Sequence, residues 1–183
     1  NLKDLDILLE AYNHKNLHGK KRINLVAVSA ASNVMGSCNN IEEISRIVHQ
    51  YGALLLVDGA QVIAHKKVDM AKWGADFLAF SAHKVYAPFG CGVLVAKKGM
   101  LDFTDNEKDL ILTSGKQNTA GIAALGKALQ LMERIGMENI EAEEQELTRI
   151  LLQSFSEIQD YKIYGIKDPD SERLSRKLGV IIF

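Results

Sequence analysis

Two side chains of opposite charge directly follow apolar runs of this sequence. Lys84 ends the segment Phe80–Lys84 (FSAHK), and Asp58 follows the apolar run 53–57. A lysine is most often a surface residue, and an aspartate after a strand is most often a turn or capping residue. A lysine held at an apolar sheet edge, however, tends to lose its proton because burial disfavours the charged form, and a neutral amine can form a Schiff base with an aldehyde.

The same two groups meet the chemical needs of pyridoxal phosphate (PLP). This cofactor requires a lysine that forms an imine and an acidic group that keeps its ring nitrogen protonated. Lys84 and Asp58 are the candidates for the two roles. Other chemistries lack their signatures, since the sequence has no G-x-G-x-x-G or G-x-x-x-x-G-K-[ST] loop, no H-E-x-x-H motif and no G-x-S-x-G elbow. We therefore expect PLP chemistry and no metal site.

The elements that would position these groups are strands of a buried sheet. Short runs rich in branched apolar residues are typical of strands that are covered on both faces. We predict four such strands, over residues 23–29, 53–57, 76–80 and 92–96. Between the first two, Asn40 can cap a helix that has Glu43 at its third position and ends at Gly52. This strand–helix–strand order predicts a parallel pair with a right-handed crossover.

Polar residues follow each of the first three predicted strands. Ligands of open α/β sheets lie beyond the carboxyl ends of the strands, so we expect these residues to converge on one edge. The three groups are Ser29 and Asn33, Asp58 and Gln61, and Ser81, His83 and Lys84. This edge is the candidate site.

The rest of the chain is expected to be mainly helical. The spacing of apolar residues predicts an amphipathic helix over 3–14 and two further apolar stripes, through Ile122–Met132 and Leu147–Ile158. The acidic run Glu141–Glu146 is expected to be a solvated helix face.

The last part of the sequence predicts further strands. Residues 161–164 and 178–183 have the apolar pattern of strands, and the second run ends without a turn or a polar tail. Because the chain also starts with Asn rather than Met, we expect it to be an internal part of a longer protein.

Composition excludes several classes of function. Hydrophobic residues make up 47% and charged residues 25% of the 183 residues, which fits a globular core rather than a disordered chain. The net charge of −1 argues against binding of nucleic acid or of a membrane surface, and no apolar stretch approaches the roughly 20 residues of a membrane span. The two cysteines, Cys38 and Cys91, fit a reducing compartment, so we expect a cytoplasmic protein.

Three motifs of the chain resemble the successive signatures of class V aminotransferase-fold enzymes. The motifs are Ser32–Gly36 (SNVMG), Val57–Gln61 (VDGAQ) and Phe80–Tyr86 (FSAHKVY). They are most similar to those of the cysteine desulfurase and selenocysteine lyase branch. The resemblance is detailed over residues 25–97 and looser elsewhere, including Asn118–Ile122 at the start of a helix.

The resemblance implies a fold and a division of the chain. The fold would be the core of the large domain of a fold type I PLP-dependent transferase, an α/β protein with three α/β/α layers and a mainly parallel sheet. Residues 1–135 would belong to this PLP-binding large domain. Residues 136–183 would form a linking helix and the start of a small C-terminal α+β domain.

The resemblance also implies roles for the edge residues. Lys84 would carry the internal aldimine and later act as the base that moves protons on the substrate. Asp58 would form a salt bridge with the pyridine nitrogen, and Gln61 would hydrogen-bond the phenolic oxygen. Ser81 and His83 would bind the phosphate.

Other positions match the family's pattern less closely. Asn33 would lie near the phenolic oxygen or the substrate carboxylate. Residues 115–118 (GKQN) occupy the place where relatives use a threonine to reach the phosphate of the partner subunit, and Lys116 is the candidate to serve that phosphate as a point charge. In desulfurases a separate cysteine attacks the sulfur of the substrate; neither Cys38 nor Cys91 matches its position, which would lie beyond Phe183. We expect both cysteines to be small core or loop residues.

These observations favour a PLP-dependent enzyme related to the cysteine desulfurases, which convert L-cysteine to L-alanine and transfer the sulfur to an enzyme thiol. The resemblance implies an amino-acid substrate, a homodimer and a sulfur-acceptor protein as partners, with the isolated piece inactive. One alternative is an aminotransferase or lyase that acts on another amino acid. The other alternative is a non-catalytic α/β scaffold domain.

Overall fold

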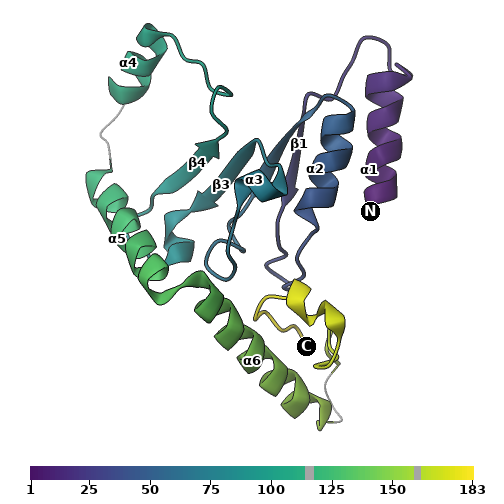
Figure 1. Ribbon diagram of the computed structural model, residues 1–183, viewed down its shortest axis with the longest axis vertical. Helices are drawn as coiled ribbons and strands as arrows, with labels where there is room; N and C mark the ends of the chain where they lie inside the picture. Colours follow the sequence, from purple (N-terminus) through teal and green to yellow (C-terminus); the bar gives the residue numbers. More distant parts are fainter. Residues whose placement is uncertain (114–117, 159–161) are drawn as a thin grey trace.

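The computed structural model describes residues 1–113, 118–158 and 162–183 (Figure 1). Its centre is a four-stranded sheet in the order β1-β2-β3-β4. The strands are β1 (Leu25–Ser29), β2 (Leu54–Asp58), β3 (Phe77–Ser81) and β4 (Gly92–Ala96). All four lie within two residues of the ranges predicted from the sequence.

Three strands run parallel and the fourth runs in the opposite direction. β1, β2 and β3 are mutually parallel neighbours, as predicted for the βαβ unit, whereas β4 is antiparallel to β3. Ten residues, 82–91, connect β3 to β4. A parallel crossover needs a dozen or more residues, so this connection allows only an antiparallel return.

Helices cover one face of the sheet. They are α1 (Leu2–Leu9), which continues as a π-helical turn η1 (Glu10–His14), α2 (Ile41–Gln50) and the short α3 (Met70–Trp73). The predicted cap of α2 is confirmed: the Asn40 side chain accepts a hydrogen bond from Glu43 N and donates one to the Glu43 carboxylate. The bond from Glu43 N satisfies a backbone group that the first turn of a helix leaves open, and the second bond joins the two side chains.

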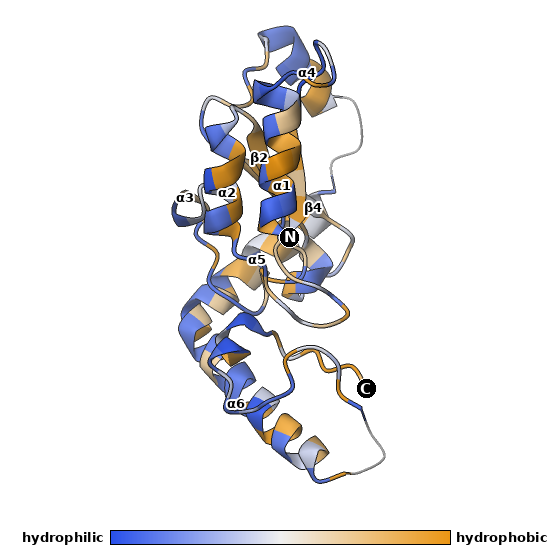
Figure 2. Ribbon diagram, turned by 90° about the vertical axis from the view of Figure 1, so that its right-hand side faces the viewer, coloured by the Kyte–Doolittle hydropathy of each residue, from blue (hydrophilic) through white to orange (hydrophobic). Residues whose placement is uncertain are grey.

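The two faces of the sheet differ in burial. Leu55, Val57 and Leu78 alternate along β2 and β3 and are buried in one hydrophobic core with Val48 of α2 and Leu9 of α1. The opposite face is open at its two edge strands, where Leu25 is 48% and Leu94 is 55% exposed. Among the described residues, no second helical layer packs on this face, so they form two layers of the expected three (Figure 2).

The C-terminal half is helical. It contains α4 (Asp105–Thr113), α5 (Thr119–Ile135), α6 (Met137–Ser156) and the 3₁₀ turn η3 (Glu172–Arg176). The stripe predicted for α6 was wrong, because Leu147 and Leu151 are about half exposed while Thr148 and Leu152 are buried. None of the helices in the described ranges has the length and apolar content to cross a bilayer.

The C-terminal segment forms no strand, which corrects the prediction for residues 178–183. Instead, Ser37 and Lys177 form an isolated antiparallel bridge, and Leu178 N donates to Gly36 O. Gly36 has a φ of +67°, and an added Cβ there would lie 2.9 Å from the carbonyl oxygen of Leu178. The C-terminal segment thus approaches the Gly36 backbone closely and forms a single bridge there, not a ladder. The other predicted strand, 161–164, begins in the part of the chain that the structure does not describe, and residues 162–164 are not in a strand.

Candidate functional site

The carboxyl ends of β1, β2 and β3 meet at one edge of the sheet. Ser29 of β1 pairs with Asp58 of β2, and Asp58 pairs with Ala79 of β3, two residues before Ser81. The predicted site residues lie at this edge or in the turns that leave it: Asn33 after β1, Asp58 at the end of β2 with Gln61 after it, and Ser81 at the end of β3 with His83 and Lys84 after it. The predicted convergence on one edge is therefore confirmed for the backbone positions.

The carboxylate of Asp58 is held by its neighbours. Ser29 Oγ donates to Oδ2 at 3.3 Å, and Ala60 N donates to Oδ1 at 2.9 Å. Asp58 is exposed, and none of the described residues forms an ion pair with it. The arrangement thus presents an oriented carboxylate that is free to meet a cation such as a protonated ring nitrogen.

The turn after Asp58 depends on a close approach to β3. Gly59 N donates to Ala79 O at 2.8 Å, and an added Cβ on Gly59 would lie 2.7 Å from Leu78 Cδ1. A larger residue at position 59 would require the Leu78 side chain or the turn to shift. Gln61 lies in the turn and is half-buried.

Lys84 lies on the 3₁₀ turn η2 (Ala82–Val85), which directly follows β3. Ala82 and Val85 are fully buried, and residues three apart share one side of a 3₁₀ turn. His83 and Lys84 therefore lie off the buried side, with His83 exposed and Lys84 half-buried. Within the described ranges, the Lys84 amine makes no hydrogen bond or ion pair, so it is available to a ligand.

The loop after Lys84 is fixed by Asn118, a contact that the sequence did not predict. The Asn118 side chain caps α5 by accepting from Gly121 N, and its amide donates to the carbonyl groups of Phe89 and Gly90. Phe89 has a φ of +74°, a region that non-glycine residues rarely adopt. Asn118 thus joins the start of α5 to the loop that follows Lys84. Lys116, the candidate for a second subunit's phosphate, lies outside the described residues.

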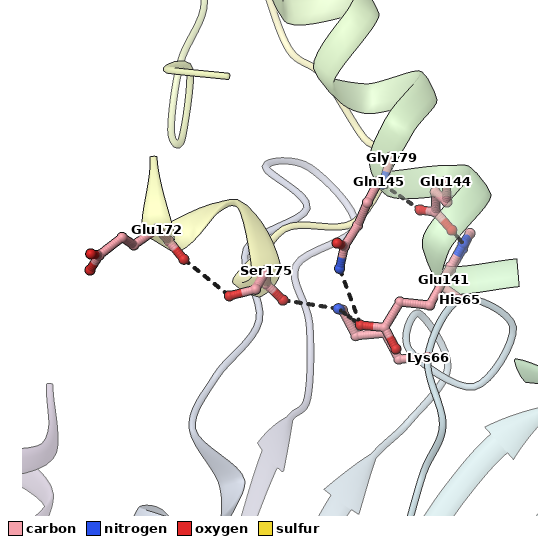
Figure 3. A network of polar contacts seen from close by, with 8 residues as sticks. All are labelled: His65, Lys66, Glu141, Glu144, Gln145, Glu172, Ser175 and Gly179. Carbon is pink, nitrogen blue, oxygen red and sulfur yellow. Dashed lines mark hydrogen bonds and ion pairs between the residues drawn. The ribbon is translucent and has the colours of Figure 1, made fainter. Parts of the chain in front are cut away.

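A second group of polar contacts lies at the far end of the turn that begins at Asp58 (Figure 3). His65 Nδ1 is 2.7 Å from Glu144 Oε2, and Lys66 Nζ is 2.5 Å from Glu141 Oε1. The expectation that the acidic run of α6 is a solvated face was therefore wrong for these two glutamates. Their spacing of three residues places both on one side of the helix, and this spacing was the only signal in the sequence.

The contacts of Glu144 alter its acidity. Burial raises the pKa of this carboxyl group, but the hydrogen bonds from His65 and from Gly179 N, with the charges of His65 and Lys66, outweigh it and lower the pKa below its ordinary value. The carboxylate form is thus the stable one in the folded chain.

The cysteines remain minor features of the structure. Cys38 and Cys91 are free and partly buried, and burial raises the pKa of the Cys38 thiol. A raised thiol pKa reduces the fraction of reactive thiolate at neutral pH. Among the described residues, no cluster of three or more His, Cys, Asp or Glu side chains is arranged to hold a metal ion.

The fold and site define an α/β protein with its candidate site at the carboxyl edge of a mainly parallel sheet. Comparison with known families gives a match of residues 8–177 to the family "Aminotransferase class-V". The chain belongs to this family, whose members depend on PLP.

Among curated proteins, the chain is similar to cysteine desulfurases. The chain is 37% identical to a probable cysteine desulfurase of Halalkalibacterium halodurans, over 79% of this chain and 40% of the relative. It is 36% identical to a cysteine desulfurase of Cronobacter sakazakii, over 89% of this chain and 43% of the relative. The chain thus spans less than half the length of these relatives.

Solved structures agree with this assignment. The apo structure of a cysteine desulfurase from Thermococcus onnurineus superposes with a TM-score of 0.77 at 27% identity, covering 99% of this chain and 46% of that one. The donor set at the carboxyl edge also fits PLP: an oriented carboxylate at Asp58 and an unpaired amine at Lys84 are the two groups that the cofactor requires.

Proposed function

We propose that this chain is the cofactor-binding part of a PLP-dependent enzyme of the cysteine desulfurase type, with Lys84 as the residue that binds the cofactor covalently. The observation that carries the proposal is the edge itself, where an oriented Asp58 carboxylate and an unpaired Lys84 amine follow neighbouring parallel strands. When bound, PLP supplies an aldehyde for the amine and a ring that accepts electrons from the substrate Cα.

Each edge residue has a proposed task. Asp58 keeps the ring nitrogen protonated, because the donors Ser29 and Ala60 leave its charge free for a cation. Lys84 Nζ takes the proton from the substrate Cα and delivers it again, since an amine without a fixed partner can change its proton state during a reaction.

The tasks proposed for the other edge residues follow from their positions at the ends of the strands. Ser81 and His83 bind the phosphate at the end of β3, where a hydroxyl group and an imidazole can both donate hydrogen bonds. Gln61 contacts the phenolic oxygen from the turn after β2. Asn33 approaches the phenolic oxygen or the substrate carboxylate from the turn after β1.

The architecture of the whole protein is part of the proposal. Residues 1–135 belong to the large domain of the three-layer fold type I architecture, and residues 136–183 form the linking helix and the start of the small domain. The open sheet face, with its exposed Leu25 and Leu94, supports a third layer contributed by the rest of the protein. We propose a homodimer that passes sulfur to an acceptor protein.

The family assignment also supports a second candidate, an aminotransferase or lyase that acts on another amino acid. That reaction needs the same Asp58 and Lys84 but no sulfur-accepting thiol. Neither cysteine of this chain matches the sulfur-accepting position, and the raised pKa of Cys38 makes it a poor nucleophile.

An absorption and product assay on the full-length protein tests the proposal. The protein with added PLP is expected to show a visible band that Lys84→Ala abolishes and Lys97→Ala, a lysine after β4 at the opposite edge, retains. L-cysteine is then expected to yield alanine. A band without alanine formation favours the aminotransferase or lyase. If the wild-type protein shows no band even with added PLP, the chain is a non-catalytic scaffold.

A further inference from the structure

The turn that carries Asp58 and Gln61 continues without a break to His65 and Lys66. Val62 N and Ile63 N both donate to Gly59 O at 3.0 Å. His65 N and Lys66 N then donate to Val62 O at 3.0 and 2.9 Å. Each part of the turn is thus hydrogen-bonded to the part before it, so a continuous series of contacts links its two ends.

Both ends of this turn are fixed to other elements. At its start, Gly59 packs against Leu78 and donates to the carbonyl group of Ala79. In its middle, Val62 and Ala64 are buried in the core. Among the described residues, its far end has no sheet contact of this kind and is held by side chains instead.

Those side chains form what we call the clamp, defined as His65, Lys66, Glu141 and Glu144 (Figure 3). A carboxylate only accepts hydrogen bonds, so His65 Nδ1 carries the hydrogen in its 2.7 Å contact with Glu144. The other oxygen of Glu144 accepts from Gly179 N. Glu144 therefore joins the turn to the C-terminal segment as well as to α6.

The second half of the clamp makes a similar double connection. Lys66 Nζ donates to Glu141 of α6 and, at 2.9 Å, to the carbonyl group of Ser175. Gln145 Nε2 donates to the same Glu141 oxygen at 3.3 Å. The turn is thus bound to both α6 and the segment 175–179.

The clamp is more buried than a neighbouring ion pair. The side chains of Lys66 and Glu141 are 15% and 32% exposed, and those of His65 and Glu144 are 32% and 21% exposed. Lys67, which follows the turn, and Glu138 of the same helix α6 are 2.7 Å apart but 68% exposed each. Removal of one partner is costly for a partly buried pair and nearly neutral for an exposed one. The Lys67–Glu138 pair therefore serves as a control for substitutions in the clamp.

We propose that His65 and Lys66 are positioning residues, which make the placement of the cofactor-binding turn depend on the docking of α6 and the segment 175–179. The proposal rests on the proposed function, because it assigns the turn to PLP. The dependence is reciprocal: docking of the C-terminal unit strengthens cofactor binding, and bound cofactor strengthens docking by the same factor.

The test compares Glu141→Gln and Glu144→Gln with the control Glu138→Gln in the full-length protein. Amide hydrogen exchange of residues 59–64, measured without PLP, is expected to accelerate in the two clamp variants and not in the control. PLP is expected to bind the clamp variants about 5-fold or more weakly. Lys66→Arg, which can keep the ion pair, is expected to restore part of the affinity that Lys66→Met loses.

A merely structural role for the clamp gives a different result. Exchange would then rise in α6 and the segment 175–179 alone, with unchanged exchange of residues 59–64 and unchanged PLP affinity, and the proposal would be overturned. A wild-type protein that binds no PLP would refute the proposed function instead, while the exchange measurement would still show whether the clamp positions the turn.

Discussion

Ser29 Oγ donates a hydrogen bond to Asp58 Oδ2, 3.3 Å away, from the position directly opposite in the parallel β1–β2 register. The contact joins a hydroxyl group and a carboxylate at the ends of two strands, so the sheet itself orients the acidic group of the candidate site. The remaining donor to the carboxylate is the backbone of Ala60, which no substitution of a side chain removes directly.

Ser29→Ala is therefore expected to weaken PLP binding to the full-length protein without removing it. The loss of one hydrogen bond costs about 1 kcal/mol, which corresponds to a roughly 5-fold higher Kd in a PLP titration. Ser154→Ala, which removes a hydroxyl group from α6 far along the chain, is the control. An unchanged Kd in Ser29→Ala would mean that the Ser29 hydroxyl does not orient Asp58.

Lys84→Ala should separate function from stability. Because the amine of Lys84 has no partner among the described residues, its removal is expected to change the free energy of unfolding by less than about 0.5 kcal/mol while abolishing the visible band of bound PLP. Lys66→Ala is expected to cost about 2 kcal/mol, because it leaves Glu141 without its ion-pair partner. Urea unfolding measures both values, and a Lys84→Ala chain as unstable as Lys66→Ala would contradict the assignment.

The lowered pKa of Glu144 predicts that this carboxyl group contributes less to the free energy of unfolding in acid. A carboxyl group whose folded pKa lies below its unfolded value, about 4.3, stabilises the fold fully above that value and loses this contribution as the pH falls through the folded pKa. The difference in unfolding free energy between wild type and Glu144→Gln, about 1 kcal/mol at neutral pH, is expected to shrink below about pH 4.3.

Glu138→Gln provides the control for that measurement. Its exposed pair with Lys67 is screened by salt, so its effect is expected to disappear at about 1 M salt while that of Glu144→Gln persists. A difference between wild type and Glu144→Gln that does not vary with pH would exclude the proposed contribution of the carboxylate.

The hydroxyl group of Tyr51 is expected to lose its proton only at high pH. Its hydroxyl group donates to Asp6 Oδ1 at 2.8 Å, and this hydrogen bond, with burial and the negative charge of Asp6, raises the pKa of Tyr51 to about 12. Since the unfolded value is about 10, the neutral hydroxyl group favours the folded state and unfolding becomes easier as the pH rises above 10. An ultraviolet titration should show one tyrosine ionising near pH 12, which Tyr51→Phe removes. Complete ionisation of all tyrosines near pH 10 in the folded wild type would contradict this.

Local patterns account for most of the correct predictions. The range predicted for β4 is the range observed, and Asn40 caps α2 as expected, because strand periodicity and capping depend on residues a few positions apart. The parallel β1–β2 pair follows from a single strand–helix–strand unit. The polar residues at the carboxyl edge were also predicted from local patterns, since the ends of the first three strands were predicted to within one residue.

The errors concern contacts between distant residues. His65 and Glu144 are 79 positions apart, and an acidic run that forms ion pairs has the same local pattern as one that faces solvent. Residues 178–183 have the composition of a strand, but the isolated bridge to Ser37 is formed by Lys177, and Leu178 N donates to Gly36 O without a ladder. The hydrogen bond from Asn118 to the loop after Lys84 likewise depends on where α5 begins in space.

The reversed direction of β4 has a practical consequence. Its five residues carry the chain roughly 16 Å along the sheet, away from Lys84 and towards α4 (Figure 1). A fluorescent dye attached between Lys97 and Thr104 would therefore sit at the opposite end of the sheet from the proposed cofactor site. Such a label could report on movements of the C-terminal helices without obstructing the entry of small molecules.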